Sequence, residues 1–141
     1  MILHIHSDAS FLSEPGAKSR AGGYHYLITA LVDPKKSPHK QQPPNGPIHV
    51  ECTTMRNVLA NVMKAELGAL FVNCQRGVAT RMAFMDVSHA QPPNPAVTES
   101  ATGYVFFNDN IRQRCSRFID IRFYWVRYRV RQGQFLVYWM A

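Results

Sequence analysis

The sequence predicts an α/β fold with a mixed, roughly five-stranded sheet and helices on its faces. Three strand-like segments come first, joined by turn-rich stretches, which is typical of an antiparallel meander. Two segments with helical periodicity follow, each next to a short apolar segment, and such alternation adds parallel strands to a sheet. The chain has 141 residues, 46% of them hydrophobic, so we expect residues 1–141 to form a single domain with one core.

The strand predictions rest on alternating side chains and on the turn residues between them. We predict a first strand over residues 1–7, a turn over 11–20, a second strand over 22–31 and a third over 48–54. The stretch 33–47 contains five prolines and is predicted to be a long connection within the domain. In the first strand, alternation assigns one face to Leu3, Ile5 and Ser7 and the other to His4, His6 and Asp8.

A long helix is predicted over residues 57–87, weakened at Gly68 and Gly77, with a break near Gly77 as an alternative to one continuous helix. Its stripe consists of Leu59, Val62, Met63, Leu70 and Asn73, which recur at steps of three and four. A short strand over 96–98, a short helix over 101–111, a second strong helix over 116–131 and a final strand over 135–140 complete the chain. Without the short helix, the predicted order is βββ-α-β-α-β.

Positive charge is concentrated near the C-terminus. The formal net charge is +7, and between residues 112 and 131 there are seven arginines but only one acid, Asp120. Such a stripe is typical of a surface that binds nucleic-acid phosphates, although a solvated basic helix without a ligand has the same composition. The arginines predicted to bind nucleic acid are Arg112, Arg114, Arg117, Arg122, Arg127, Arg129 and Arg131.

Composition also narrows the classes of protein to consider. Apolar runs are far shorter than the ~18 residues of a membrane span, and residues 1–8 lack the pattern of a signal peptide. The three cysteines form no C-x-x-C pair, so neither a disulfide framework nor a zinc site is indicated. We therefore expect a soluble intracellular protein of the cytoplasm or nucleus with no membrane partner.

Three acids are the candidate catalytic and metal-binding residues. Asp8 follows the first predicted strand, Glu66 interrupts the apolar stripe of the long helix, and Glu99 follows the short strand. Burying an unpaired carboxylate costs several kcal/mol, so Glu66 needs a metal, a partner or a raised pKa, unless it lies at the edge of the stripe and reaches solvent. Acids at one sheet edge would suit Mg²⁺, and two such ions can support phosphodiester cleavage.

Four segments of the chain carry motifs that occur together in a known family. They are Ser-Asp-Ala-Ser at 7–10, Ala-Glu-Leu-Gly-Ala-Leu-Phe at 65–71, Thr-Glu-Ser at 98–100 and the basic segment Arg-Cys-Ser-Arg-Phe-Ile-Asp-Ile-Arg-Phe-Tyr-Trp at 114–125. In this order, and over nearly the whole chain, they resemble the ribonuclease H domain of copia-type retrotransposons. At the third segment that family has Thr-Asp-Asn or Thr-Asp-Ser.

This resemblance implies a ribonuclease H-like fold that cuts the RNA strand of an RNA–DNA hybrid during reverse transcription. In that family two Mg²⁺ ions, or Mn²⁺, sit between four acids. By position, Asp8 would bridge the metals, Glu66 would hold one of them, and Glu99 would take the third acidic position. A longer polyprotein with a preceding reverse transcriptase domain is also compatible with the resemblance.

Three departures from the family pattern lead us to expect weak or no activity. Glu99 replaces an aspartate, and its extra methylene moves the carboxylate by about 1 Å. The family's fourth acid lies in an Ala-Asp-x-x-Thr-Lys segment, and Ala141 ends the chain before it, so the domain is expected to be truncated. Tyr128 stands where relatives often have an acid.

Two other interpretations stay open. A catalytically inactive ribonuclease H-like scaffold would bind nucleic acid through its arginines, with Tyr124 and Trp125 stacking on bases, although Trp125 is better explained as a core residue. A metal-dependent hydrolase of the polymerase-and-histidinol-phosphatase type would use His4 and His6, but that fold needs a larger barrel and further ligands. On the ribonuclease H interpretation, these two histidines pack or titrate on the sheet.

Overall fold

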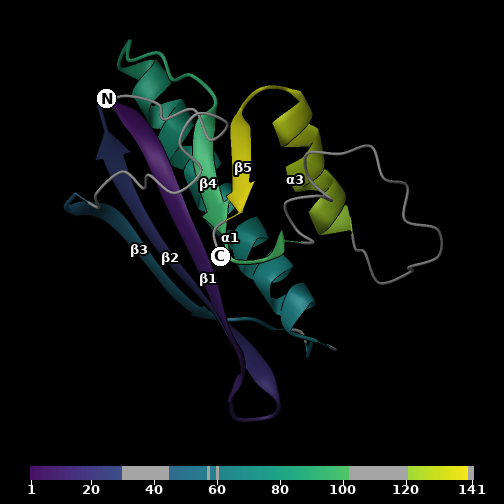
Figure 1. Cartoon of the computed structure of the whole chain (residues 1–141). Helices are drawn as coiled ribbons and strands as arrows, with labels where there is room; N and C mark the ends of the chain where they lie inside the picture. Colours follow the sequence, from purple (N-terminus) through teal and green to yellow (C-terminus); the bar gives the residue numbers. More distant parts are fainter. Residues whose placement is uncertain (30–44, 57, 60, 102–120, 140–141) are drawn as a thin grey trace.

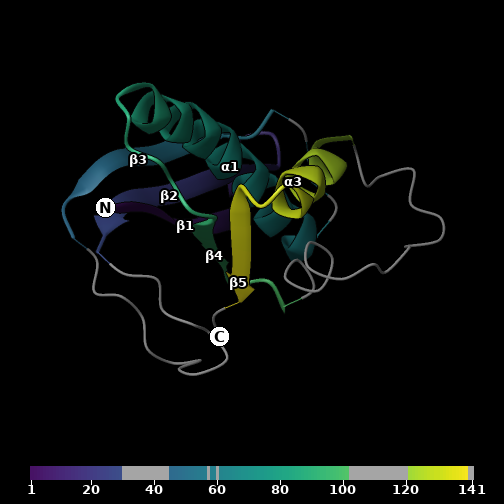
Figure 2. The same ribbon diagram turned by 90° about the horizontal axis from the view of Figure 1, so that it is seen from above.

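In the part of the chain that it describes, the computed structural model has a five-stranded sheet with the helices α1 and α3 on one of its faces (Figures 1 and 2). It describes residues 1–29, 45–56, 58–59, 61–101 and 121–139. In chain order the described elements are β1 (Ile2–Glu14), β2 (Lys18–Ile28), β3 (Pro47–Thr54), α1 (Val62–Asp86), β4 (Asn94–Thr98), α3 (Ile121–Arg131) and β5 (Phe135–Trp139). The predicted α/β class, mixed sheet and order of elements are therefore confirmed.

The strands lie in the order β3-β2-β1-β4-β5. β1 pairs antiparallel with β2, and β2 antiparallel with β3, as a meander requires. β1 pairs parallel with β4, and β4 parallel with β5, because a helix-containing crossover precedes each of these two later strands. β1 is therefore the strand at which the antiparallel and parallel halves of the sheet meet.

The predicted turn over residues 11–20 is wrong, because β1 continues to Glu14 and β2 already begins at Lys18. The turn is confined to residues 15–17, where Gly16 and Ala17 adopt positive φ angles of 76° and 56°. An irregularity in the pairing between Ser10 and Glu14, with Leu12 at φ 52°, lets β1 extend through polar residues. These polar residues have the composition of a loop, which is why the sequence predicted a turn there.

The long helix is unbroken at Gly77, so the alternative with a break near this residue is wrong. A Cβ at Gly77 would lie 2.5 Å from Ile5 Cδ1 and 3.2 Å from Phe135 Cε1, so the glycine allows the helix to approach the sheet closely. The predicted stripe also needs correction, since Val62 is exposed and Leu59 lies before the helix. The buried face of α1 consists instead of Ala65, Glu66, Leu67, Ala69, Leu70, Asn73, Cys74 and Gly77.

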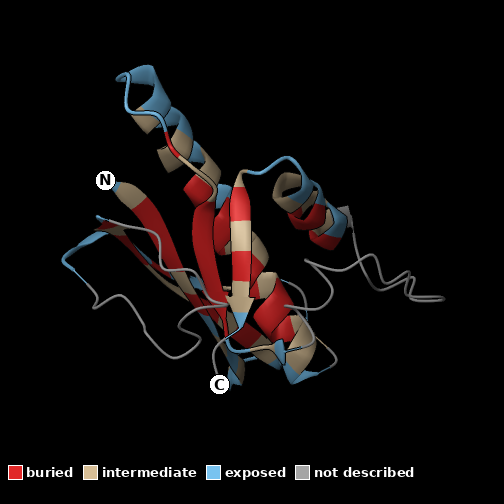
Figure 3. Cartoon of the chain, turned by 45° about the horizontal axis from the view of Figure 1, so that its top comes forward, coloured by how far each residue is buried: buried red, intermediate tan, exposed pale blue. Residues whose placement is uncertain are grey.

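The main core lies between the sheet and the two helices (Figure 3). Leu3 and Ile5 of β1, Leu70 of α1, Val126 of α3 and Phe135 of β5 are fully buried there. Leu3 and Ile5 were assigned to one strand face from the sequence, and this face is the one that packs on α1. Among the described residues no helix is long and apolar enough to cross a membrane.

Several predicted segments lie wholly or partly outside the described residues. These are most of the proline-rich connection at 33–47, most of the short helix at 101–111, and the beginning of the helix predicted at 116–131. The third strand, the short strand and the final strand are observed within two residues of their predicted starts.

Candidate acidic site

Glu66 is a buried acid on the helix face that packs against the sheet. Its residue is only 7% exposed, so the alternative in which its side chain reaches solvent does not hold. Its Oε2 has no hydrogen-bond partner. The nearby backbone N–H of Ala9, which donates to Asp8 Oδ1 at 2.7 Å, acts to lower the pKa of Glu66. A buried carboxyl oxygen without a partner destabilises the fold and is uncommon in native structures.

Asp8 and Glu99 are the acidic neighbours of Glu66. Burial raises the pKa of Glu66 to about 7, and the negative charges of Asp8 and Glu99 contribute to this rise. The parallel register of β1 and β4 explains why these acids are near one another: His6 pairs with Val97, and two residues further along each strand come Asp8 and Glu99. Both of these acids are exposed, at the end of the sheet where β4 finishes and β1 continues.

The three acids share one electrostatic environment but do not surround a single point. In the described parts of the chain, no three His, Cys, Asp or Glu side chains are placed so that they could hold one metal ion together. The donor chemistry nevertheless fits a divalent cation such as Mg²⁺, because all three are hard carboxylate ligands. An ion there would also give the unpartnered Oε2 of Glu66 a ligand bond and lower the pKa of this acid.

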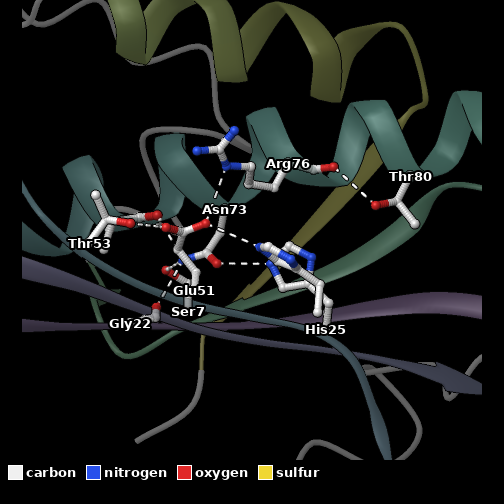
Figure 4. A network of polar contacts seen from close by, with 10 residues as sticks. Ser7, Gly22, His25, Glu51, Thr53, Asn73, Arg76 and Thr80 are labelled. Atoms are coloured by element: carbon white, nitrogen blue, oxygen red, sulfur yellow. Dashed lines mark hydrogen bonds and ion pairs between the residues drawn. The ribbon is translucent and has the colours of Figure 1, made fainter.

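Asn73, two helical turns after Glu66, fixes α1 to the sheet (Figure 4). Its Nδ2 donates to Ser7 Oγ at 3.2 Å, to the Gly22 carbonyl oxygen at 2.9 Å and to the Ala69 carbonyl oxygen at 2.9 Å. Its Oδ1 lies 2.9 Å from His25 Nε2. Because Asn73 is fully buried, these contacts hold the helix face of Glu66 in one register against β1 and β2.

A second buried acid, Glu51 of β3, belongs to the same side of the sheet (Figure 4). Burial acts to raise its pKa, but hydrogen bonds from Thr53, His49 and Arg76 outweigh burial and lower it. Its Oε2 is 3.1 Å from His49 Nε2 and 3.3 Å from Arg76 Nε. Glu51 is thus a satisfied anion that joins β3 to α1, unlike Glu66, and the sequence analysis did not identify it.

His4 packs on the sheet, as the ribonuclease H interpretation expects. Its ring is stacked on that of Tyr26, with centroids 4.7 Å apart, and the residue is 8% exposed. Burial, and to a lesser extent the nearby charge of His6, lowers the pKa of His4 to about 4. His4 is therefore uncharged at neutral pH.

The predicted arginine stripe is only partly described. Arg112, Arg114 and Arg117 lie outside the described residues. Arg131 is exposed, Arg122 and Arg129 are half-buried, and Arg127 is buried, so these four do not form one uniform exposed surface.

Trp125 occupies a packed position on α3, which confirms its assignment to the core. It meets Phe71 edge-on at 5.5 Å, and the guanidinium of Arg129 lies 4.9 Å from its ring centroid. Arg129 also donates to Gln134 Oε1 at 3.0 Å. The indole of Trp125 is thus already covered by protein groups on α1 and α3.

Comparison of the chain with protein-family models, with curated proteins and with solved structures gave no match.

Proposed function

We propose that this chain is a ribonuclease H-like domain related to those of copia-type retrotransposons. Its ancestral activity would be metal-dependent endonucleolytic hydrolysis of the RNA strand of RNA–DNA hybrids, weak or lost in this chain. The observation that carries the proposal is Glu66: a buried acid with an unpartnered oxygen and a pKa raised to about 7 by burial and by Asp8 and Glu99. Perturbed acids that share one charge environment are typical of functional sites.

Two further features support the proposal. The described elements follow the order βββ-α-β-α-β that the sequence patterns predict, and this order is compatible with a ribonuclease H-like fold. The resemblance also selects Asp8, Glu66 and Glu99 as the site acids. Asp8 and Glu99 are the two acids whose negative charges raise the pKa of Glu66. The selection rested on residue motifs and the pKa on three-dimensional proximity, so the two arguments are independent.

In this proposal Asp8, Glu66 and Glu99 hold Mg²⁺ or Mn²⁺. A bound divalent ion would activate a water molecule and stabilise the leaving oxygen of the phosphodiester. Glu66 forms the inner side of the site, because it is buried on α1. Asp8, within β1, and Glu99, directly after β4, are exposed and would face the nucleic acid.

We expect little or no cleavage of an RNA–DNA hybrid by the chain in Mg²⁺ or Mn²⁺, but we expect either ion to stabilise the fold. At an ion concentration ten times the dissociation constant, the free energy of unfolding should rise by about 1.4 kcal/mol. Thermal unfolding at pH 8 with and without Mn²⁺ measures this effect, which should be lost in Asp8→Asn and kept in the surface control Glu14→Gln.

The expected inactivity and the expected stabilisation by metal each have a result that would contradict them. Robust hybrid cleavage that Asp8→Asn abolishes would overturn the expected inactivity but support the site. Equal melting temperatures with and without Mn²⁺ in the wild-type chain would overturn the metal site itself.

The second candidate function is nucleic-acid binding by a catalytically inactive scaffold. It is favoured by the observation that the three acids do not surround one point among the described residues, while Arg131 offers an exposed cation on α3. In this case the seven predicted arginines, apart from the buried Arg127, would be the main source of affinity.

Both candidate functions predict salt-sensitive binding to an RNA–DNA hybrid. If about three phosphates are neutralised, affinity should fall between tenfold and a hundredfold, roughly, from 50 to 200 mM salt, because each contact releases counterions. Fluorescence anisotropy of a labelled hybrid measures this, with Arg131→Gln expected to reduce the slope and Lys18→Gln, on the distant β-hairpin, expected to leave it unchanged. Affinity that does not respond to salt would contradict both functions.

A further inference from the structure

Trp139 is an exposed aromatic residue at the rim of the acidic site. It is the last residue of β5, where it pairs in parallel register with Thr98 of β4. Its indole Nε1–H donates to the carbonyl oxygen of Glu99 at 3.2 Å. Trp139 is 48% exposed, whereas Thr98 is 1% exposed.

The hydrogen bond to Glu99 restrains the side chain of Trp139, unlike a surface side chain that rotates freely. Indole is a large apolar ring with one polar group, and exposed tryptophans are enriched at binding interfaces. Here the polar group is already used on Glu99, so the orientation of the ring is restrained while its surface stays accessible. The other tryptophan, Trp125, has its ring covered by Phe71 and Arg129 and offers no comparable surface.

The surroundings of Trp139 favour a nucleic-acid ligand. The chain as a whole has a net charge of +7, which attracts polyanions. Aromatic rings on rigid elements next to cations are the usual stacking platforms for unpaired bases.

We propose that Trp139 is the stacking contact for an unpaired nucleobase of a single-stranded segment next to the acidic site, such as the overhang of an RNA–DNA hybrid. This inference rests on the proposed function, and it adds a substrate-positioning residue that neither the acids nor the arginines account for. The restrained indole would hold one nucleotide beside Glu99, and the adjoining phosphate would then lie next to the acids and any ion that they bind.

The intrinsic fluorescence of Trp139 tests the proposal. The chain has two tryptophans, so Trp125→Phe leaves Trp139 as the only one. Titration of this variant with a short poly(dT) oligonucleotide in Mg²⁺ should quench its emission saturably, because stacking on a base quenches indole. A blunt DNA duplex, which offers few unpaired bases, should quench it less. Trp139→Phe, in which Trp125 is the only tryptophan, should show no comparable change.

Affinity gives a second readout. Trp139→Leu should weaken poly(dT) binding, measured by anisotropy, about tenfold. Tyr128→Leu is the matched control, since Tyr128 is an exposed aromatic residue of α3, 59% exposed, and its removal should change affinity less than about twofold. If Trp139→Leu unfolds, Trp139→Phe replaces it, with an expected loss of about threefold.

The failures of the two proposals are distinguishable. Binding of poly(dT) without quenching of Trp139, or no binding at all, overturns the stacking role whatever the metal does. Quenching of Trp139 in a chain that Mn²⁺ does not stabilise would support the nucleotide contact and overturn the metal-dependent hydrolase.

Discussion

Replacement of Gly23 by alanine should lower the free energy of unfolding by about 3–5 kcal/mol. A Cβ at this position would lie 1.7 Å from Asn73 Oδ1 and 2.5 Å from Asn73 Cγ, so the two side chains cannot both keep their places. Overpacking of a core typically costs about 1–3 kcal/mol, and each buried polar group left without a partner costs about as much again. Urea unfolding followed by circular dichroism would measure the loss.

The loss is large because Asn73 has several buried partners. If its side chain moves, Ser7, His25 and the Gly22 carbonyl lose hydrogen bonds at the interface between α1 and the sheet. His25 is fully buried and its Nδ1 already lacks a partner, so little compensation is available there.

Two variants control this prediction. Gly22→Ala, one residue away, should change stability by less than about 0.5 kcal/mol, since the nearest atom to its added Cβ is the Asp8 carbonyl oxygen at an ordinary 3.7 Å. Gly23→Ala combined with Asn73→Ala should be less destabilised than the sum of the two single variants, because the collision disappears. Additive losses would show that Gly23 does not contact Asn73 in the way described.

Alternation and helical periodicity were enough to predict the layers of the fold. Leu3 and Ile5 share a strand face because side chains alternate, and that face is buried against α1. The turn over residues 11–20 was mispredicted, since Ser13 and Pro15 look like loop residues and the sequence does not reveal the extended pairing of β1. Local composition does not predict a strand segment that forms because it pairs with another strand, as the end of β1 does with β2.

The acidic site was predictable only in part. Glu66 was conspicuous because an acid on an apolar helical stripe is rare, and its burial agrees with that interpretation. The proximity of Asp8 to Glu99 depends on the parallel register of β1 and β4, two strands that are far apart in the sequence. Trp139 was taken for an ordinary apolar strand residue, since its exposure and its bond to Glu99 arise only where β5 finishes.

Replacement of Glu66 by glutamine should stabilise the metal-free protein at pH 8 by up to about 3 kcal/mol and change its stability little at about pH 4.5. The pKa of Glu66 is about 7 in the folded chain, against the ordinary value of 4.5 that it regains on unfolding. As the pH rises above this ordinary value the unfolded chain loses the proton first, so stability falls until the pH passes about 7. Each unit of pKa difference corresponds to about 1.4 kcal/mol, and glutamine removes this penalty while keeping the shape of the side chain.

His4 makes the free energy of unfolding depend on pH in the opposite direction, so the contributions of His4 and Glu66 must be measured in separate variants. Its pKa falls from 6.5 to about 4 on folding, so its contribution to stability is fully present above pH 6.5 and is lost as the pH falls toward 4, by up to about 3 kcal/mol. Between about pH 4.5 and 6.5 the slopes due to His4 and Glu66 therefore offset each other in the wild-type chain. Glu66→Gln should expose a loss of stability on acidification, and His4→Phe, which keeps a ring to stack on Tyr26, should expose a gain. Urea unfolding across this range tests both signs at once, and the same slope in both variants would mean that at least one of the two groups titrates as it does in the unfolded chain.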